Sequence, residues 1–207
     1  MNVRAPFSLG ETMAGVDSDA VEINEDWIGH VQWFYPNDMD DTGANGVKRR
    51  RTNKPVRCVC LRNRSGGTLG GSDIVRMSTS EPSASPYGAN TIPALEEVAG
   101  LTASIGQFGV IVDEFVPAAG VASLALFWAV LDGPVKARLP ANGGWTTNLD
   151  PGDLVVANAA GAVVEATSAT SAVAFLHAVN LIGRALETRA TTGDDDGLVL
   201  INACIRW

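Results

Sequence analysis

DPGDLVVANAAGAVVE, residues 150–165, places two short apolar runs between corners made of Asp, Pro, Gly and Asn. The same arrangement repeats through the C-terminal part of the chain, in residues 127–131, 135–139, 181–186 and 198–205. Apolar runs of this length between tight turns are typical of the strands of antiparallel barrels and sandwiches. We therefore expect a mainly β fold, an antiparallel β-barrel or sandwich with long loops, and a chain corner at Asp132-Gly133-Pro134.

The middle of the chain is less regular. Residues 56–63 are expected to form a half-buried strand, because apolar and cationic positions partly alternate there, and residues 73–77 and 107–115 are expected to form further strands. A helical turn is predicted at residues 96–99. A long loop with several prolines is predicted at residues 78–93, where a β protein often makes its contacts.

The first 55 residues are expected to form an extended N-terminal arm with one or two strands and a charged loop. Within it, the aromatic run at residues 27–36 has the composition of a strand and is stopped by Pro36. We therefore divide the chain into an arm and charged loop at residues 1–55 and a β-rich domain at residues 56–207.

Charge is segregated along the chain. Residues 1–47 hold nine acids and one base, residues 48–64 hold eight bases and no acid, and residues 65–207 hold fourteen acids and six bases. The whole chain has a net charge of −8 and a pI near 4.7. Because only 18% of the residues are charged and 46% are hydrophobic, we expect a partner to cover part of the surface.

The basic block is the candidate binding site. The residues assigned to partner binding are Lys48, Arg49, Arg50, Arg51, Lys54 and Arg57. Clustered cations can pair with the carboxylates of an acidic protein surface, bind the phosphates of a nucleic acid, or remain as a solvated loop. The acidic overall charge favours protein contacts, as does the lack of aromatic residues in the block that could stack on bases. A nucleic-acid-binding module that uses the run 48–64 is the alternative function.

No motif in the sequence indicates catalysis, a metal or a cofactor. Cys58 and Cys60 have no second pair at zinc spacing, so we expect them to be buried strand thiols in a reducing compartment. The acidic run 194–196 lacks the alternating ligands of a calcium loop and is expected to be a solvated corner. Asp113 and Glu114 are adjacent, so on a strand they would point to opposite faces. We expect no enzyme, although a site built from residues distant in sequence is a third hypothesis.

The order of these pieces resembles virion structural proteins of tailed bacteriophages, and the closing strands are similar to head decoration, or cement, proteins. The segments that carry the resemblance are residues 56–69, GVIVDEF at 109–115, Pro117, Gly120-Val121, Phe127-Trp128, Gly133-Pro134, Gly152-Asp153-Leu154-Val155, Ile182-Gly183-Arg184-Ala185-Leu186 and residues 199–207. The resemblance extends over residues 56–207. It does not include the acidic arm or the arginine run.

The resemblance implies a capsid-binding domain at residues 56–207 that binds the major capsid protein on the outer surface of the phage head and stabilises the shell. It also implies a homotrimer, made in the host cytoplasm and located on the virion. The longest apolar stretch, residues 121–131, is shorter than the roughly 20 residues that a membrane helix needs, so we expect no membrane contact. Self-association is expected as well if Phe127, Trp128 or Trp207 lies outside the core and exposes aromatic area.

Overall fold

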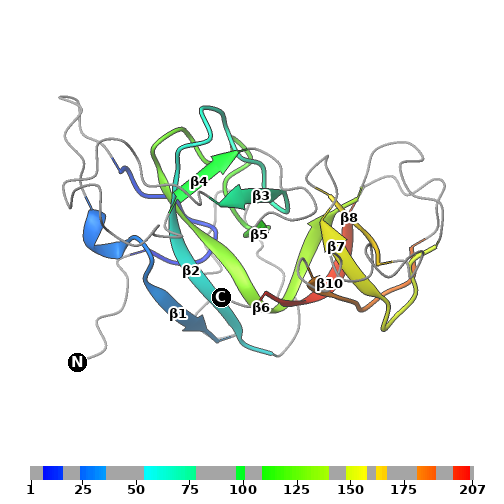
Figure 1. Cartoon of the computed structure of the whole chain (residues 1–207). Helices are drawn as coiled ribbons and strands as arrows, with labels where there is room; N and C mark the ends of the chain where they lie inside the picture. The colour runs from blue at the N-terminus through cyan, green and yellow to red at the C-terminus, as the bar shows by residue number, and fades with distance from the viewer. Residues whose placement is uncertain are drawn as a thin grey trace, which may run out of the picture.

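The structure is a computed structural model that describes residues 7–15, 24–35, 54–77, 97–100, 109–139, 148–157, 162–166, 181–189 and 198–205. These residues form a short 3-10 helix, η1 (Glu25–Trp27), and the strands β1 (Val31–Phe34), β2 (Val56–Asn63), β3 (Ile74–Met77), β4 (Glu97–Gly100), β5 (Gly109–Val112), β6 (Leu126–Arg138), β7 (Leu154–Ala157), β8 (Val163–Glu165), β9 (Leu181–Ala185) and β10 (Leu198–Cys204). The strands join in one ten-stranded sheet in the order β1-β2-β4-β3-β5-β6-β10-β9-β7-β8 (Figure 1). The predicted mainly β, antiparallel fold is confirmed.

The long strand β6 connects the two ends of this sheet. Its first half pairs with β2 and β5, and its second half pairs with β10. The predicted corner at residues 132–134 is therefore wrong, because the chain bends there without leaving the strand (Figure 1). Gly133 has a φ of 104°, and a Cβ at this position would lie 2.7 Å from the Pro55 carbonyl oxygen, so glycine is required for the bend.

The predicted helical turn at residues 96–99 is also wrong. Residues 97–99 belong to β4, which pairs in parallel with β2 and antiparallel with β3, and residue 96 lies outside the described residues. Hydrogen-bonding partners on both sides outweigh the weak local preference for a helix that the sequence carries. β3 also pairs with β5, and both β5 and β2 pair with β6. The pairings therefore run from β2 through β4, β3, β5 and β6 and back to β2.

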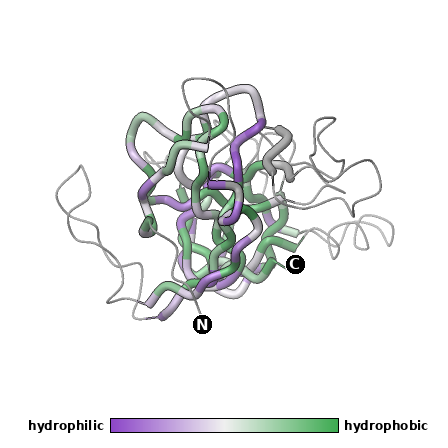
Figure 2. Tube along the Cα trace, turned by 90° about the vertical axis from the view of Figure 1, so that its left-hand side faces the viewer, coloured by the Kyte–Doolittle hydropathy of each residue, from purple (hydrophilic) through white to green (hydrophobic). Residues whose placement is uncertain are grey.

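The core at the β2 end is organised around the indole of Trp128 on β6. Phe7 stacks on it with ring centroids 5.2 Å apart, and Phe34 meets it edge-on at 4.9 Å. The indole N–H donates to the Phe7 carbonyl at 3.2 Å, which satisfies its buried polar group. Residues from the predicted arm thus belong to the core, while the domain boundary after residue 55 stays a prediction. In Figure 2 the hydrophobic stretches of the described trace run through the middle of the molecule.

Strand β2 is buried on both faces, which corrects the predicted half-buried strand. Every residue of β2 except Arg57 is buried, including Arg62 at 1% exposure and Asn63. The Asn63 amide donates to the carbonyls of Gly67 and Val121, so its polar atoms are satisfied by the neighbouring loops. β2 has neighbouring strands on both sides, and both of its faces are covered. The alternation of side chains in the sequence does not reveal that the second face is covered.

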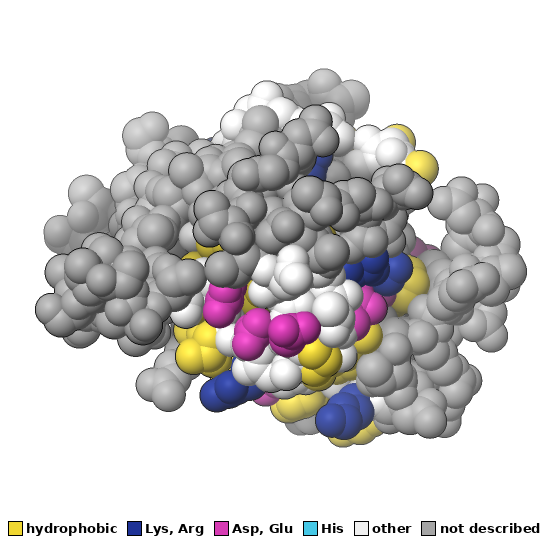
Figure 3. All heavy atoms as spheres, turned by 90° about the vertical axis from the view of Figure 1, so that its right-hand side faces the viewer, with side chains coloured by type: hydrophobic (Ala, Val, Ile, Leu, Met, Phe, Trp, Pro, Cys, Tyr) yellow, Lys and Arg dark blue, Asp and Glu magenta, His cyan; other side chains and the backbone are white. Residues whose placement is uncertain are grey.

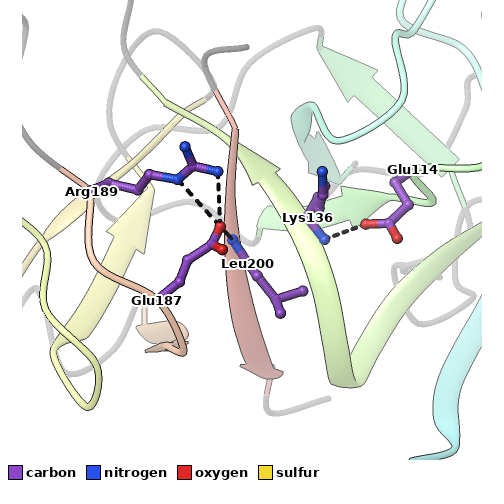
Figure 4. Close-up of polar contacts among 5 residues, drawn as sticks. All are labelled: Glu114, Lys136, Glu187, Arg189 and Leu200. Carbon is purple, nitrogen blue, oxygen red and sulfur yellow. Dashed lines mark hydrogen bonds and ion pairs between the residues drawn. The ribbon is translucent and has the colours of Figure 1, made fainter. Parts of the chain in front are cut away.

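Two carboxylates accept main-chain N–H groups of β6 and β10 (Figure 4). Glu114 accepts the N–H of Lys136, and Glu187 accepts the N–H of Leu200 at 2.6 Å while pairing with Arg189 at 3.1 Å. Lys136 and Leu200 are register partners in the β6–β10 pair. The carboxylates therefore act as acceptors for donors of both strands of this pair.

Candidate partner-binding site

Strand β1 lies at one end of the sheet and exposes one of its faces. Val31, Trp33 and Tyr35 are 41%, 44% and 55% exposed, although all three are large and apolar or aromatic. Their spacing of two residues places them on the same face of an extended chain. Phe34 points to the opposite face and packs on Trp128. β1 is thus anchored by its inner face and presents an aromatic stripe on its outer face.

The main chain of β1 is open on the side away from β2. The N–H of Cys60 donates to the His30 carbonyl at 2.9 Å, so these residues form a hydrogen-bonded position of the antiparallel pair. Hydrogen-bonded and non-hydrogen-bonded positions alternate, which makes Val31 and Trp33 non-hydrogen-bonded positions. Their N–H and C=O groups therefore point away from β2. No other strand in the described ranges pairs with this side of β1.

Arg57 lies beside the exposed face of β1. It is the register partner of Trp33 on β2, and facing residues at a non-hydrogen-bonded position hold their side chains close together. Arg57 is half-buried, and its Nε is buried with no hydrogen-bond partner in the described part of the chain. Asp132 on β6 is also a register partner of Arg57, but the two side chains form no ion pair within the described part of the chain. The outer face of β1 and β2 thus combines exposed aromatic area with a guanidinium group.

The predicted binding residues divide into two groups. Lys54 is exposed two residues before β2 begins, and Arg57 is half-buried on β2, where it is the register partner of Trp33 on β1. Lys48, Arg49, Arg50 and Arg51 lie outside the described residues.

The cations at the end of the block belong to a different environment. Arg62 is buried in β2, and Arg64 is half-buried after it. A burial this complete leaves Arg62 no surface for a phosphate. The eight bases of the block therefore do not form one continuous cationic surface.

Sequence reasoning did not assign the exposed stripe to a site. Val31, Trp33 and Tyr35 were part of an aromatic run expected to be an arm strand, and Phe34 is equally apolar. Because both faces of β1 carry aromatic residues, alternation could not tell which face is exposed. The available signal was the combination of the strand-like run with the terminating Pro36, which is typical of an edge strand.

Two of the three cysteines are buried in the core, and the third is exposed. Cys58 and Cys60 are buried as predicted, and Cys204 is exposed at the end of β10. Burial raises the pKa of the Cys60 thiol from 9.0 to about 12. A thiol with this pKa stays protonated at neutral pH, which disfavours metal binding through thiolate. No cluster of three or more His, Cys, Asp and Glu side chains that could hold a metal occurs among the described residues.

The structure also shows where some of the aromatic and acidic residues named in the sequence analysis lie. Phe127 and Trp128 are fully buried, so they cannot support self-association, and Trp207 lies outside the described residues. Asp113 is buried and Glu114 half-buried just after β5, while the acidic run 194–196 lies outside the described residues. Within the described ranges, no helix has the length and apolar composition needed to cross a membrane.

Comparison with known proteins gives little further information. No protein-family model matches the chain, and no curated protein is similar to it in sequence. A crystal structure of the head fiber gp8.5 N base of bacteriophage phi29 is similar with a TM-score of 0.37 and 14% identity, over 70% of this chain and 92% of that chain. A similarity at this score establishes neither a common fold nor a common function.

Proposed function

We propose that this chain is a non-enzymatic structural protein of a bacteriophage head, of the decoration or cement type, which binds the outer surface of the capsid shell through protein contacts. The observation that carries the proposal is the exposed stripe of Val31, Trp33 and Tyr35 beside Arg57. Exposed aromatic area next to an arginine is the composition of the energetically important part of protein interfaces. The sequence resemblance to head decoration proteins supplies the kind of partner, the major capsid protein.

The mechanism follows from mass action. A protein that binds the assembled shell more tightly than free capsid subunits shifts the equilibrium toward the shell. Each copy can bind weakly, because linked copies add their binding energies through multivalency. A homotrimer would place three such faces on one particle surface.

Nucleic-acid binding by the run 48–64 is less well supported. Phosphate binding requires cations that are accessible together, whereas Arg62 is buried and Arg57 and Arg64 are half-buried. These burials leave at most part of the block for a phosphate backbone. They are compatible with cations that pair with protein carboxylates at an interface.

Co-sedimentation with phage shells tests the proposal. The chain should sediment with shells assembled from the major capsid protein of its own virus. Replacing Lys48, Arg49, Arg50 and Arg51 together with Ala should weaken binding by on the order of 1–4 kcal/mol, because exposed ion pairs contribute about 0.2–1 kcal/mol each. A gel-shift titration of the same two proteins supplies the contrast. Binding to DNA that falls steeply with salt, without binding to shells, would overturn the decoration function.

A further inference from the structure

Among the described residues, no strand pairs with the main-chain donors and acceptors at two positions on the outer edge of β1. Val31 and Trp33 direct their N–H and C=O groups away from β2, as the hydrogen bond from Cys60 to His30 requires. The open edge of a sheet is a template for a further strand, and proteins commonly block such edges with charged side chains, prolines or bulges. Within Val31–Phe34 there is no charged residue and no proline. This edge is chemically ready to pair with another chain.

The side chains around the edge indicate what kind of strand it accepts. Trp33 and Val31 would lie next to alternate side chains of an added strand, since neighbouring strands place facing residues on the same side. Arg57 lies across β1 from that strand, two strand spacings or about 10 Å away, which two long side chains that extend toward each other can span, and its Nε has no hydrogen-bond partner among the described residues. A carboxylate on the incoming strand matches the guanidinium of Arg57.

We propose that β1 is a strand-addition site, at which an extended, acid-bearing segment of the partner pairs with Val31 and Trp33 and places a carboxylate near Arg57. The inference rests on the proposed function for the identity of the partner, a capsid protein, but the edge geometry stands without it. Four residues of β1 give only a short pairing, so a single contact is weak. Repetition over the shell would make it effective.

The direction of the main-chain groups makes a single variant informative. Val31→Pro removes an N–H that points to the open edge, so it costs no hydrogen bond between β1 and β2, and an edge strand tolerates proline at such a position. Val31→Ala shortens the same side chain but keeps the N–H. The pair separates a main-chain contact from an apolar one. Equal melting temperatures of the two variants would establish that both fold.

The probe is a fluorescein-labelled decapeptide of alternating Thr and Glu, titrated with the full chain at low salt and followed by anisotropy. Saturable binding is expected. Val31→Pro should weaken it about tenfold, the equivalent of one or two lost hydrogen bonds, and Arg57→Gln should also weaken it. Val31→Ala should change it by less. A peptide with Lys in place of Glu should not bind. Absence of saturable binding, equal binding by Val31→Pro and wild type, or equal binding of the Lys peptide would each overturn the proposal.

Two further measurements separate strand addition at β1 from the decoration function and from pairing of β1 with a second copy of the chain. If the wild type does not sediment with shells, the decoration function fails, and the peptide titration still decides the strand-addition site. If Val31→Pro sediments with shells as well as the wild type does, the decoration function stands and strand addition fails. Sedimentation velocity tests a second copy as occupant: a dimer that Val31→Pro dissociates would show that β1 pairs with itself, and would overturn the assignment to an acid-bearing partner strand.

Discussion

The two outer strands of the sheet, β1 and β8, differ in the features that block pairing with a further strand. β8 has three residues, Val163 is buried, and Val164 and Glu165 are half-buried. The end of the molecule near β7 and β8 carries acidic and basic side chains scattered among apolar ones (Figure 3). β1 instead exposes Val31 and Trp33 and carries no charge. An edge that is short and charged resists pairing, so the contrast supports the proposal that β1 is the edge that accepts a partner strand.

The largest effect is expected from the anchor of β1. Phe34→Ala removes the ring that packs edge-on against Trp128, and should lower the free energy of unfolding by about 3–5 kcal/mol. Val164→Ala on the half-buried face of β8 should cost about 1 kcal/mol or less. Urea denaturation of both variants measures the difference. Equal costs would mean that β1 is no better anchored than β8.

A change near the other end of the sheet should destabilise the protein without altering the β1 edge. A Cβ at Gly183 would lie 2.2 Å from the main-chain oxygen of Asn202, so Gly183→Ala must displace β9 from β10 and should cost about 1–3 kcal/mol. Gly66→Ala is the control, because it has a positive φ but nothing within 4 Å of the new Cβ. Thermal denaturation should show the larger loss for Gly183→Ala. A loss no larger than that of Gly66→Ala, whose cost comes from its positive φ, would show that β9 and β10 accommodate the new Cβ.

Stability should depend on pH through the buried Cys60 thiol on β2. Burial raises the Cys60 pKa to about 12, while the unfolded thiol titrates near 9.0. Below pH 9 both states are protonated, and as pH rises from about 9 to about 12 only the unfolded state loses its proton. The free energy of unfolding should therefore fall by up to about 1.4 kcal/mol per pH unit in this range.

Cys60→Ala controls for the other groups that titrate in alkaline solution. Its stability should fall less steeply than that of the wild type between pH 9 and 12. Parallel curves for the two proteins would show that Cys60 does not carry the dependence. The exposed Cys204 offers an internal contrast, since it should react with iodoacetamide under native conditions while Cys58 and Cys60 do not.

The smallest effect on stability is expected at the exposed stripe itself. Trp33→Thr keeps a good strand former and removes only exposed area, so the free energy of unfolding should change by about 0.5 kcal/mol or less. Partner binding should nevertheless be lost. Leu154→Thr, at an exposed position of β7, is the matched control and should leave binding unchanged. A destabilisation of several kcal/mol by Trp33→Thr would mean that the stripe is part of the core.

The sequence predicted the fold best where one face of a strand is covered. In β10, Val199, Ile201 and Ala203 are buried while the residues between them are not, and this strand was predicted closely. β2 was predicted in position but not in burial, because both of its faces are covered, which the partial alternation in its sequence does not reveal. The corner at Gly133 was misjudged since Gly and Pro in sequence mark a bend without saying whether strand pairing continues through it.

Of the candidate site, the sequence predicted the cations but not the aromatic stripe. Lys54 and Arg57 lie where a partner could reach them, and the run 48–51 remains a prediction. The openness of Val31 and Trp33 depends on the register of β1 against β2, which is a property of the assembled sheet. No composition or spacing rule contains that register.

The openness of the β1 edge can be measured directly by amide hydrogen exchange, resolved by residue, in the isolated protein. We expect the amides of Val31 and Trp33 to exchange at least about tenfold faster than those of Gln32 and Phe34, which face β2 in the same strand. The alternation should survive in Val31→Ala, whose N–H groups are unchanged. Equal protection of all four amides would show that the edge is already covered, and would contradict the central claim that β1 is open to a partner strand.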